Sequence, residues 1–104
     1  MISKPNGPKS VYKSHLDEGS LLNRVQPRYP QPAKIAGIHG DVLLKAIIGK
    51  NGSIESLEVE SGHPWLVAAA VEAVRQWRYR PYILNGEPVE VETQITVRFQ
   101  MGDR

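Results

Sequence analysis

The sequence contains no cysteine and only one phenylalanine among its 104 residues. Without cysteine the chain can form neither a disulfide bond nor a thiolate metal site. This absence does not exclude an oxidising compartment, because it removes only one marker of such a compartment. No apolar run approaches the roughly 20 residues that a membrane-spanning helix needs, and no signal peptide is visible at Met1. We therefore expect a soluble chain of one domain.

Charge of one sign is not in large excess either. The formal net charge is +2 and the sequence pI is about 9.0. A basic pI raises the question of nucleic acid, and Arg75, Arg78 and Arg80 are the residues that would bind it. Glutamates cluster at 55–60 and 87–92, however, so the charges alternate along the chain. We expect no nucleic-acid partner, and a gel shift at two ionic strengths would test this alternative.

Signatures of catalysis are missing. The three histidines, His15, His39 and His63, have no second metal ligand at a recognised spacing. The sequence has no nucleophile elbow, Walker motif or dinucleotide-binding glycine pattern. His39 and Asp41 are close, but at the start of a predicted strand they are typical of a turn. We expect neither an enzyme nor a bound metal or cofactor.

Residues 61–81 are the stretch that the rest of the chain is organised around, and they predict one amphipathic helix. Pro64 suits the first helical turn, and Ser61 or His63 offers a cap. Arg80 precedes Pro81, so the helix is predicted to end there. The apolar positions recur at spacings of three and four: Leu66, Ala70, Ala73 and Trp77. Trp77 also lies among arginines and tyrosines, which can bind nucleic acid, but its place on this stripe favours the core.

Strand patterns lie on both sides of this helix. Residues 40–59 predict a hairpin around Asn51-Gly52, with a bulge near Ile54, which is out of phase with the next apolar positions. Residues 89–99 alternate strictly between apolar and polar, as in a strand with one wet face. A short helix at 31–36 ends at Gly37. This order predicts an α+β fold with two helices on one face of an antiparallel sheet of about three strands.

The N-terminal residues are expected to be less ordered than the rest of the chain. Residues 1–20 have no apolar period and are rich in turn formers, so we expect a flexible tail. The domain is predicted to span residues 21–101. No strand pattern follows 89–99, so this strand is predicted at the edge of the sheet with unpaired N–H and C=O groups. From the residues alone, a protected edge and an edge that accepts an extended peptide are both open.

A family resemblance favours the second interpretation. Gln26-Pro27-Arg28-Tyr29-Pro30, Gly40-Asp41-Val42 and Gln76-Trp77-Arg78-Tyr79-Arg80-Pro81 resemble the C-terminal domain of TonB, the energy transducer of Gram-negative bacteria. The resemblance covers residues 22–99. Ser61-Gly62-His63-Pro64 and the hairpin at 84–89 are similar to the shorter TonB-like domains of several bacterial phyla.

The resemblance implies a periplasmic domain of an inner-membrane-anchored protein. Such domains bind the TonB box of outer-membrane transporters by adding it to the final strand, and an ExbB–ExbD-type motor drives them through an N-terminal anchor. That anchor is not seen here, and residues 1–20 are expected to be the end of the periplasmic linker. For Tyr29, packing on the sheet is an equal alternative. The implied partner-binding residues are Arg24, Gln26, Tyr29, Val91, Glu92, Thr93, Gln94, Ile95, Thr96, Val97 and Arg98.

A rival interpretation is a TonB-like or TolA-like envelope module that contacts another periplasmic protein or peptidoglycan without coupling to transport. Its binding would survive blocking of the edge strand. An open edge can also pair with a second copy of the chain, so a homodimer is a further expectation to test.

Overall fold

The structure, a computed structural model, describes residues 10–14, 16 and 18–101. Its elements in chain order are β1 (Ser10–Lys13), a 3-10 helix η1 (Glu18–Ser20), β2 (Leu21–Asn23), α1 (Gln31–Ala36), β3 (Gly40–Ile48), β4 (Ile54–Ser61), α2 (Pro64–Val74), β5 (Arg78–Tyr79), β6 (Tyr82–Leu84) and β7 (Glu87–Phe99). Neither α-helix has the length or apolar content needed to cross a bilayer.

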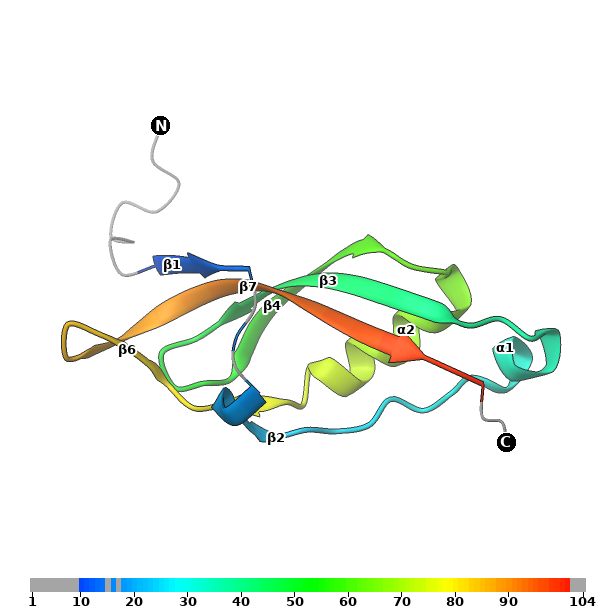
Figure 1. The fold of residues 1–104 in the computed structure, drawn as a ribbon, viewed down its shortest axis with the longest axis horizontal. Helices are drawn as coiled ribbons and strands as arrows, with labels where there is room; N and C mark the ends of the chain where they lie inside the picture. The colour runs from blue at the N-terminus through cyan, green and yellow to red at the C-terminus, as the bar shows by residue number, and fades with distance from the viewer. Residues whose placement is uncertain (1–9, 15, 17, 102–104) are drawn as a thin grey trace.

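The centre of the sheet is the antiparallel pair of β3 and β7. Their register runs without a shift from Gly40 opposite Phe99 to Ile48 opposite Val91. The strand order is β1-β7-β3-β4, with β6 paired to the beginning of β7 (Figure 1). β2 and β5 form a separate two-stranded sheet. The alternation of β7 is confirmed, because its odd-numbered residues from Val89 to Phe99 are buried and the even-numbered ones are at least partly exposed.

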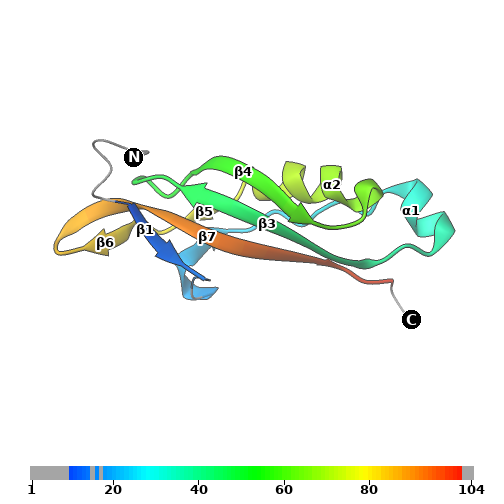
Figure 2. The ribbon, with the colours of Figure 1, turned by 90° about the horizontal axis from the view of Figure 1, so that it is seen from above.

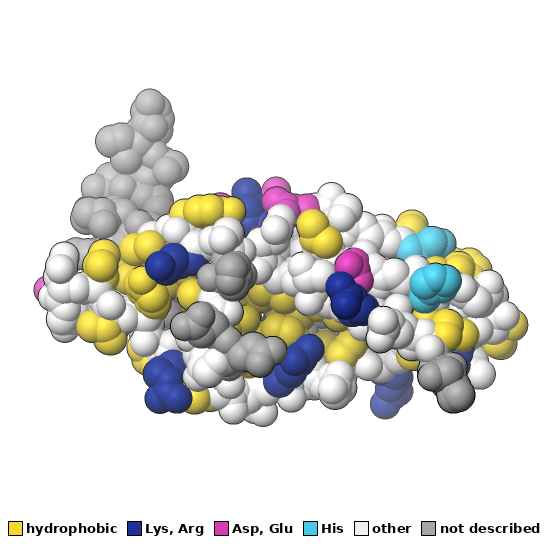
Figure 3. Space-filling view, viewed as in Figure 1, with side chains coloured by type: hydrophobic (Ala, Val, Ile, Leu, Met, Phe, Trp, Pro, Cys, Tyr) yellow, Lys and Arg dark blue, Asp and Glu magenta, His cyan; other side chains and the backbone are white. Residues whose placement is uncertain are grey.

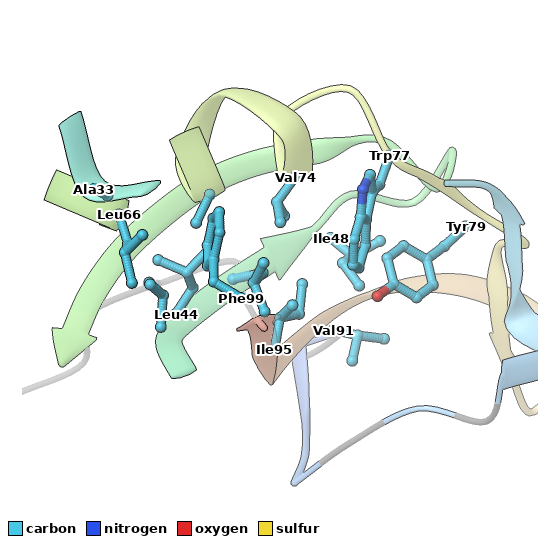
Figure 4. Close-up of a cluster of buried hydrophobic side chains, with 14 residues drawn as sticks. Ala33, Leu44, Ile48, Leu66, Val74, Trp77, Tyr79, Val91, Ile95 and Phe99 are labelled. Carbon is cyan, nitrogen blue, oxygen red and sulfur yellow. The ribbon is translucent and has the colours of Figure 1, made fainter. Parts of the chain in front are cut away.

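Both helices lie on one face of this sheet, as Figure 2 shows. α2 packs on β3 and β4, and α1 packs on α2. The backbone N–H of Trp65 donates to Nδ1 of His63, which caps α2 in front of Pro64. Leu66, Ala70 and Val74 of α2 then meet the buried side chains of β3 and β7 (Figure 4). The predicted α+β class and the placement of the helices are confirmed.

The hairpin of β3 and β4 carries the predicted irregularity. Ile47 lies opposite Ser56 but Ile48 lies opposite Ile54, so one residue of β4 is extra. β3 is central, between β7 and β4. Its outward side chains Leu43 and Ile47 are half-buried, because the helices cover only the opposite face.

The second helix is shorter than its sequence predicts. α2 ends at Val74, and Arg78–Tyr79 form a strand. The expected stop at Arg80 is therefore wrong. Two backbone bonds explain the change, because Tyr79 N–H donates to the carbonyl of Gly52 and Arg80 N–H to that of Ser20. Both bonds need extended backbone. Trp77 is 4% exposed and belongs to the core, as expected.

The sheet has more strands than expected, and it is mixed. Ser10–Lys13 pairs with β7 in parallel, with Ser10 opposite Glu90 and Lys13 opposite Thr93. The expectation that residues 1–20 form a flexible tail is therefore wrong for β1 and η1, whereas residues 1–9, 15 and 17 lie outside the described residues. The short β1 has no hydrophobic periodicity to reveal it, and its backbone pairing on β7 does not depend on one.

Gly52, in the turn between β3 and β4, lies very close to the backbone of β5. Its φ is +90°, and a Cβ there would lie 1.8 Å from the carbonyl oxygen of Tyr79. Gly86, in the turn between β6 and β7, also has a positive φ of +81°, but nothing lies within 4 Å of its Cβ position. The two glycines thus separate the cost of backbone conformation from the cost of a clash.

We expect Gly52→Ala to lower the free energy of unfolding by at least about 3 kcal/mol, since it adds a clash to the strain. Gly86→Ala should cost only about 1–2 kcal/mol, the cost of the left-handed conformation alone. Urea denaturation measures both. Equal losses for the two variants would contradict the close approach.

Thr93 is a buried polar residue on the core face of β7. It is 1% exposed, and its Oγ1 has no hydrogen-bond partner among the described residues. Thr93→Val keeps the shape and removes the unsatisfied hydroxyl, so we expect it to raise the free energy of unfolding by about 1 kcal/mol. Thr96→Val on the exposed face is the control and should change stability by less than about 0.5 kcal/mol. A destabilised Thr93→Val protein would mean that the hydroxyl has a partner in solution.

Candidate functional site

The edge of β7 that faces away from β3 is only partly covered. β1 pairs with Glu90–Thr93 on this side, whereas β6 pairs with Glu87–Val89 on the β3 side, beyond the end of β3. Beyond Thr93, residues 94–99 have no partner strand on this side within the described part of the chain. We call residues 94–99 the open half. The expectation of a bare final strand is thus wrong for Val91, Glu92 and Thr93, whose edge β1 occupies.

The hairpin between β3 and β4 fixes which backbone groups of β7 point to this edge. Gly49 N–H donates to the carbonyl of Ser53 on the β4 side, so the even-numbered residues of β3 direct their N–H and C=O groups toward β7. These residues lie opposite the odd-numbered residues of β7, and the β3–β7 register has no shift. The even-numbered residues of β7 therefore direct their N–H and C=O groups away from β3. In the open half these residues are Gln94, Thr96 and Arg98.

The same alternation agrees with the position of Pro88. Pro88 has no N–H, and its parity turns that missing donor away from β3. The pairing with β1 on that side begins at Glu90, so no hydrogen bond is lost at Pro88.

A second edge lies on β4, at the other end of the sheet. No strand among the described residues pairs with its outer side. Beside it is a hollow of about 290 Å³ lined by residues of β4, Val71 and Arg75. The sequence analysis did not identify this edge. The signal was available, since a hairpin strand that leads directly into a helix crossover has a neighbour on one side only.

Residues 24–30, which we call the strap, form an extended segment between β2 and α1. The strap runs alongside the open half of β7 (Figures 1 and 2). Tyr29 lies edge-on to Phe99, with ring centroids 5.5 Å apart, and its hydroxyl donates to the carbonyl of Ile38. In the view of Figure 3, hydrophobic surface is exposed on this face, with Lys and Arg side chains around it. Tyr29 thus packs at the end of the sheet, next to the open half.

The other two strap residues of the predicted site lie elsewhere. The guanidinium of Arg24 is 5.4 Å from the ring centroid of Trp77. Trp77 Nε1–H donates to the carbonyl of Val25 at 2.9 Å, which attaches the strap to the core. Gln26 is exposed and lines a hollow of about 280 Å³ between the strap and α2, together with Arg28, Glu72 and Gln76. Arg24 and Gln26 therefore face the helix side of the strap.

Polar side chains on the outer face of the sheet are paired with one another. Lys45 Nζ lies 3.3 Å from Glu58 and 3.8 Å from Glu92. The hydrogen bond with Glu58 raises the pKa of Lys45. The remaining two contacts join other strands: Arg98 Nε to Asp41 at 3.1 Å and Gln94 Nε2 to Glu60 at 2.6 Å. Side chains of the open half thus contribute cross-strand contacts, and its backbone groups are the ones left to pair.

The structure therefore brings together only part of the predicted site. Tyr29 and residues 94–99 lie at one end of β7, whereas Arg24 and Gln26 lie toward α2. No cluster of metal-ligating side chains occurs among the described residues. His63 acts as a helix cap, His39 contacts the carbonyl of Gly37, and His15 lies outside the described residues.

Burial of Tyr79 generates a pH prediction. Desolvation raises the pKa of the Tyr79 phenol, and the nearby charge of Arg24 offsets part of this increase. The folded state thus holds this proton more tightly than the unfolded state. Its contribution to stability is complete below pH 10, the usual pKa of tyrosine, and is lost as the pH rises further.

We expect the free energy of unfolding of the wild type to fall more steeply between pH 9 and pH 11 than that of Tyr79→Phe. Urea denaturation at intervals of pH measures the two slopes, and a comparison at pH 8 gives the effect of the substitution itself. Parallel slopes would show that Tyr79 does not titrate differently on folding.

Comparisons with known proteins agree with this arrangement. Residues 25–101 match the family described as Gram-negative bacterial TonB protein C-terminal. The chain is 36% identical over 89 residues to the protein TonB of Vibrio cholerae, covering 83% of this chain and 36% of that protein. It is 31% identical over 85 residues to the protein TonB of Xanthomonas campestris, covering 80% and 38%. It thus spans little more than a third of the length of these relatives.

A solved structure is similar as well. The solution NMR structure of the Pseudomonas aeruginosa TonB C-terminal domain superposes with a TM-score of 0.69 at 25% identity, covering 85% of this chain and 92% of that one. TonB is a non-enzymatic energy transducer in transport, which confirms that this chain is not an enzyme. The motifs, the fold and the match over residues 25–101 together show that the chain belongs to the TonB C-terminal domain family.

Proposed function

We propose that this domain binds an extended segment of an outer-membrane transporter, the TonB box, by strand addition at the open half of β7. The observation that carries this proposal is the unpaired edge at residues 94–99, next to the strap. In the cell envelope the domain would act in the periplasm. The proposal includes coupling to an ExbB–ExbD-type motor. This coupling would take place through a region outside the part of the relatives that this chain spans.

Backbone pairing suits this task. The edge groups of Thr96 and Arg98 can each donate and accept a hydrogen bond, and such bonds do not depend on the side chains of the ligand. One domain can therefore accept segments of different sequence. Tyr29 would hold the end of the acceptor strand in place through its contact with Phe99.

The side chains of the open half have a different role in this proposal. Thr96 is exposed on the outer face of the sheet, where a neighbouring strand would bring its own side chains close. Ile95 and Val97 are buried in the core. A proline at Ile95 would remove an N–H that faces β3 and also a core side chain, so loss of binding in that variant would be ambiguous.

Disulfide trapping avoids this ambiguity, because the wild-type chain has no cysteine. Thr96→Cys places a thiol on the open half, and Ser56→Cys places a matched thiol on β4, at the opposite edge. Synthetic transporter peptides with a single cysteine in the TonB box serve as probes. We expect trapping with Thr96→Cys at least about tenfold faster than with Ser56→Cys, since edge pairing brings only the first thiol near the peptide.

Amide exchange of the wild type with the cysteine-free peptides gives the second readout. The amides of Thr96 and Arg98 should become protected, whereas those of residues on β4 should not. Equal trapping at the two edges, or protection confined to β4, would exclude the open half as the binding site. Trapping and protection at neither edge would count against strand addition altogether.

A further inference from the structure

β1 is the strand of the main sheet with the weakest attachment. Its pairing covers only Ser10–Lys13, and it pairs with no strand other than β7. None of its described side chains belongs to the core, and Tyr12 is 63% exposed. By contrast, Val42, Leu44 and Ala46 of β3 are fully buried. Backbone bonds therefore hold β1 to the sheet, with little contribution from side-chain burial.

A side-chain contact connects β1 to β6. Lys13 Nζ lies 5.3 Å from the ring centroid of Tyr82 on β6. A cation–π contact at an exposed position is weak. Leu16, which follows β1, is partly buried against the core. Leu16 thus attaches the chain after β1 to the domain independently of the pairing of β1.

The position of β1 is the informative feature. It lies on the same side of β7 as the open half, and it ends at Thr93, where the open half begins. The backbone groups of Glu90 and Glu92 have the same orientation as those of the edge residues of the open half. Without β1, residues 90–99 would form one continuous edge to which five residues, rather than three, direct their backbone groups.

We propose that β1 is an exchangeable strand that occupies residues 90–93 of β7 until an extended partner segment replaces it. Exchange joins these residues to the open half and gives one acceptor edge from Glu90 to Phe99. Because β1 runs parallel to β7, the groups it leaves accept a parallel strand. The identity of the incoming segment rests on the proposed function, whereas exchange of β1 can be tested without it.

A double proline substitution in the full chain tests the exchange. Val11→Pro with Tyr12→Pro removes two consecutive N–H groups, one of which faces β7 whatever the phase of β1. Val11→Thr with Tyr12→Thr is the matched control, since it keeps both N–H groups and a strand-compatible side chain. Hydrogen exchange then separates the two sides of β7, because Glu92 and Gln94 face β1 while Val91 and Thr93 face β3.

In the proline variant we expect the amides of Glu92 and Gln94 to exchange at least about tenfold faster than in the wild type. Val91 and Thr93 should be unchanged, and the threonine variant should behave as the wild type. Unchanged exchange at Glu92 and Gln94 would overturn the proposal. Loss of protection at Val91 and Thr93 would also overturn it, since β1 would then be an integral part of the sheet.

A synthetic peptide with the sequence of residues 8–15 is the second probe. It should restore protection at Glu92 and Gln94 in the proline variant, and it should bind the wild type about tenfold more weakly because β1 competes with it. Failure to bind the proline variant would overturn the exchange, because the vacated edge would then not accept a strand.

Transporter peptides distinguish this inference from the proposed function. If β1 competes with them, they bind the proline variant about tenfold more tightly than the wild type and the threonine variant. Equal binding to all three proteins overturns the exchange and leaves the proposed function standing. Binding to none of them, while the peptide of residues 8–15 binds the proline variant, overturns the proposed function alone.

Discussion

The unbroken antiparallel pairing of β3 and β7 is the constraint on which the remaining structure depends. Its register from Gly40–Phe99 to Ile48–Val91 fixes which side chains enter the core and which backbone groups face outward. A shift by one residue would turn Val91, Ile95 and Val97 to solvent and reverse the groups at the edge. Burial on one face therefore also determines the hydrogen-bonding pattern that the open half offers.

The core explains why this register is so well specified. α2 adds Leu66, Ala70 and Val74 to the residues of β3 and β7, and Trp77 and Tyr79 close the end near the strap. Trp77 has two functions, because its ring is buried while its Nε1–H binds the carbonyl of Val25. This hydrogen bond thus holds the strap against the core, although most side chains of the strap are exposed or half-buried.

Much of this fold could be predicted from local patterns. The alternation of residues 89–99, the hairpin at Asn51-Gly52, the exit of the first helix at Gly37 and the bulge near Ile54 each have a local cause in backbone preference or in one-sided burial. The end of α2 could not be predicted in this way. Trp77 continues the helical stripe in sequence, but bonds to Gly52 and Ser20, which are distant in the chain, make the backbone extended.

The candidate site shows the same limit. The sequence indicates a last strand at an edge, but it does not show that a segment as early as Ser10–Lys13 covers part of that edge. Pairing of this kind depends on backbone groups and on a free neighbour, and neither leaves a periodic pattern in the short strand itself. The different positions of Tyr29 and Gln26 depend likewise on the direction of the strap over the core.

The direction of β7 has a mechanical consequence. A polypeptide paired along the open half and pulled along its own axis would load all its hydrogen bonds in shear, so that they have to break together. A pull across the sheet would instead break the same bonds one after another from an end. An edge joint of few bonds can therefore be strong along the strand axis and still release readily when the pull changes direction.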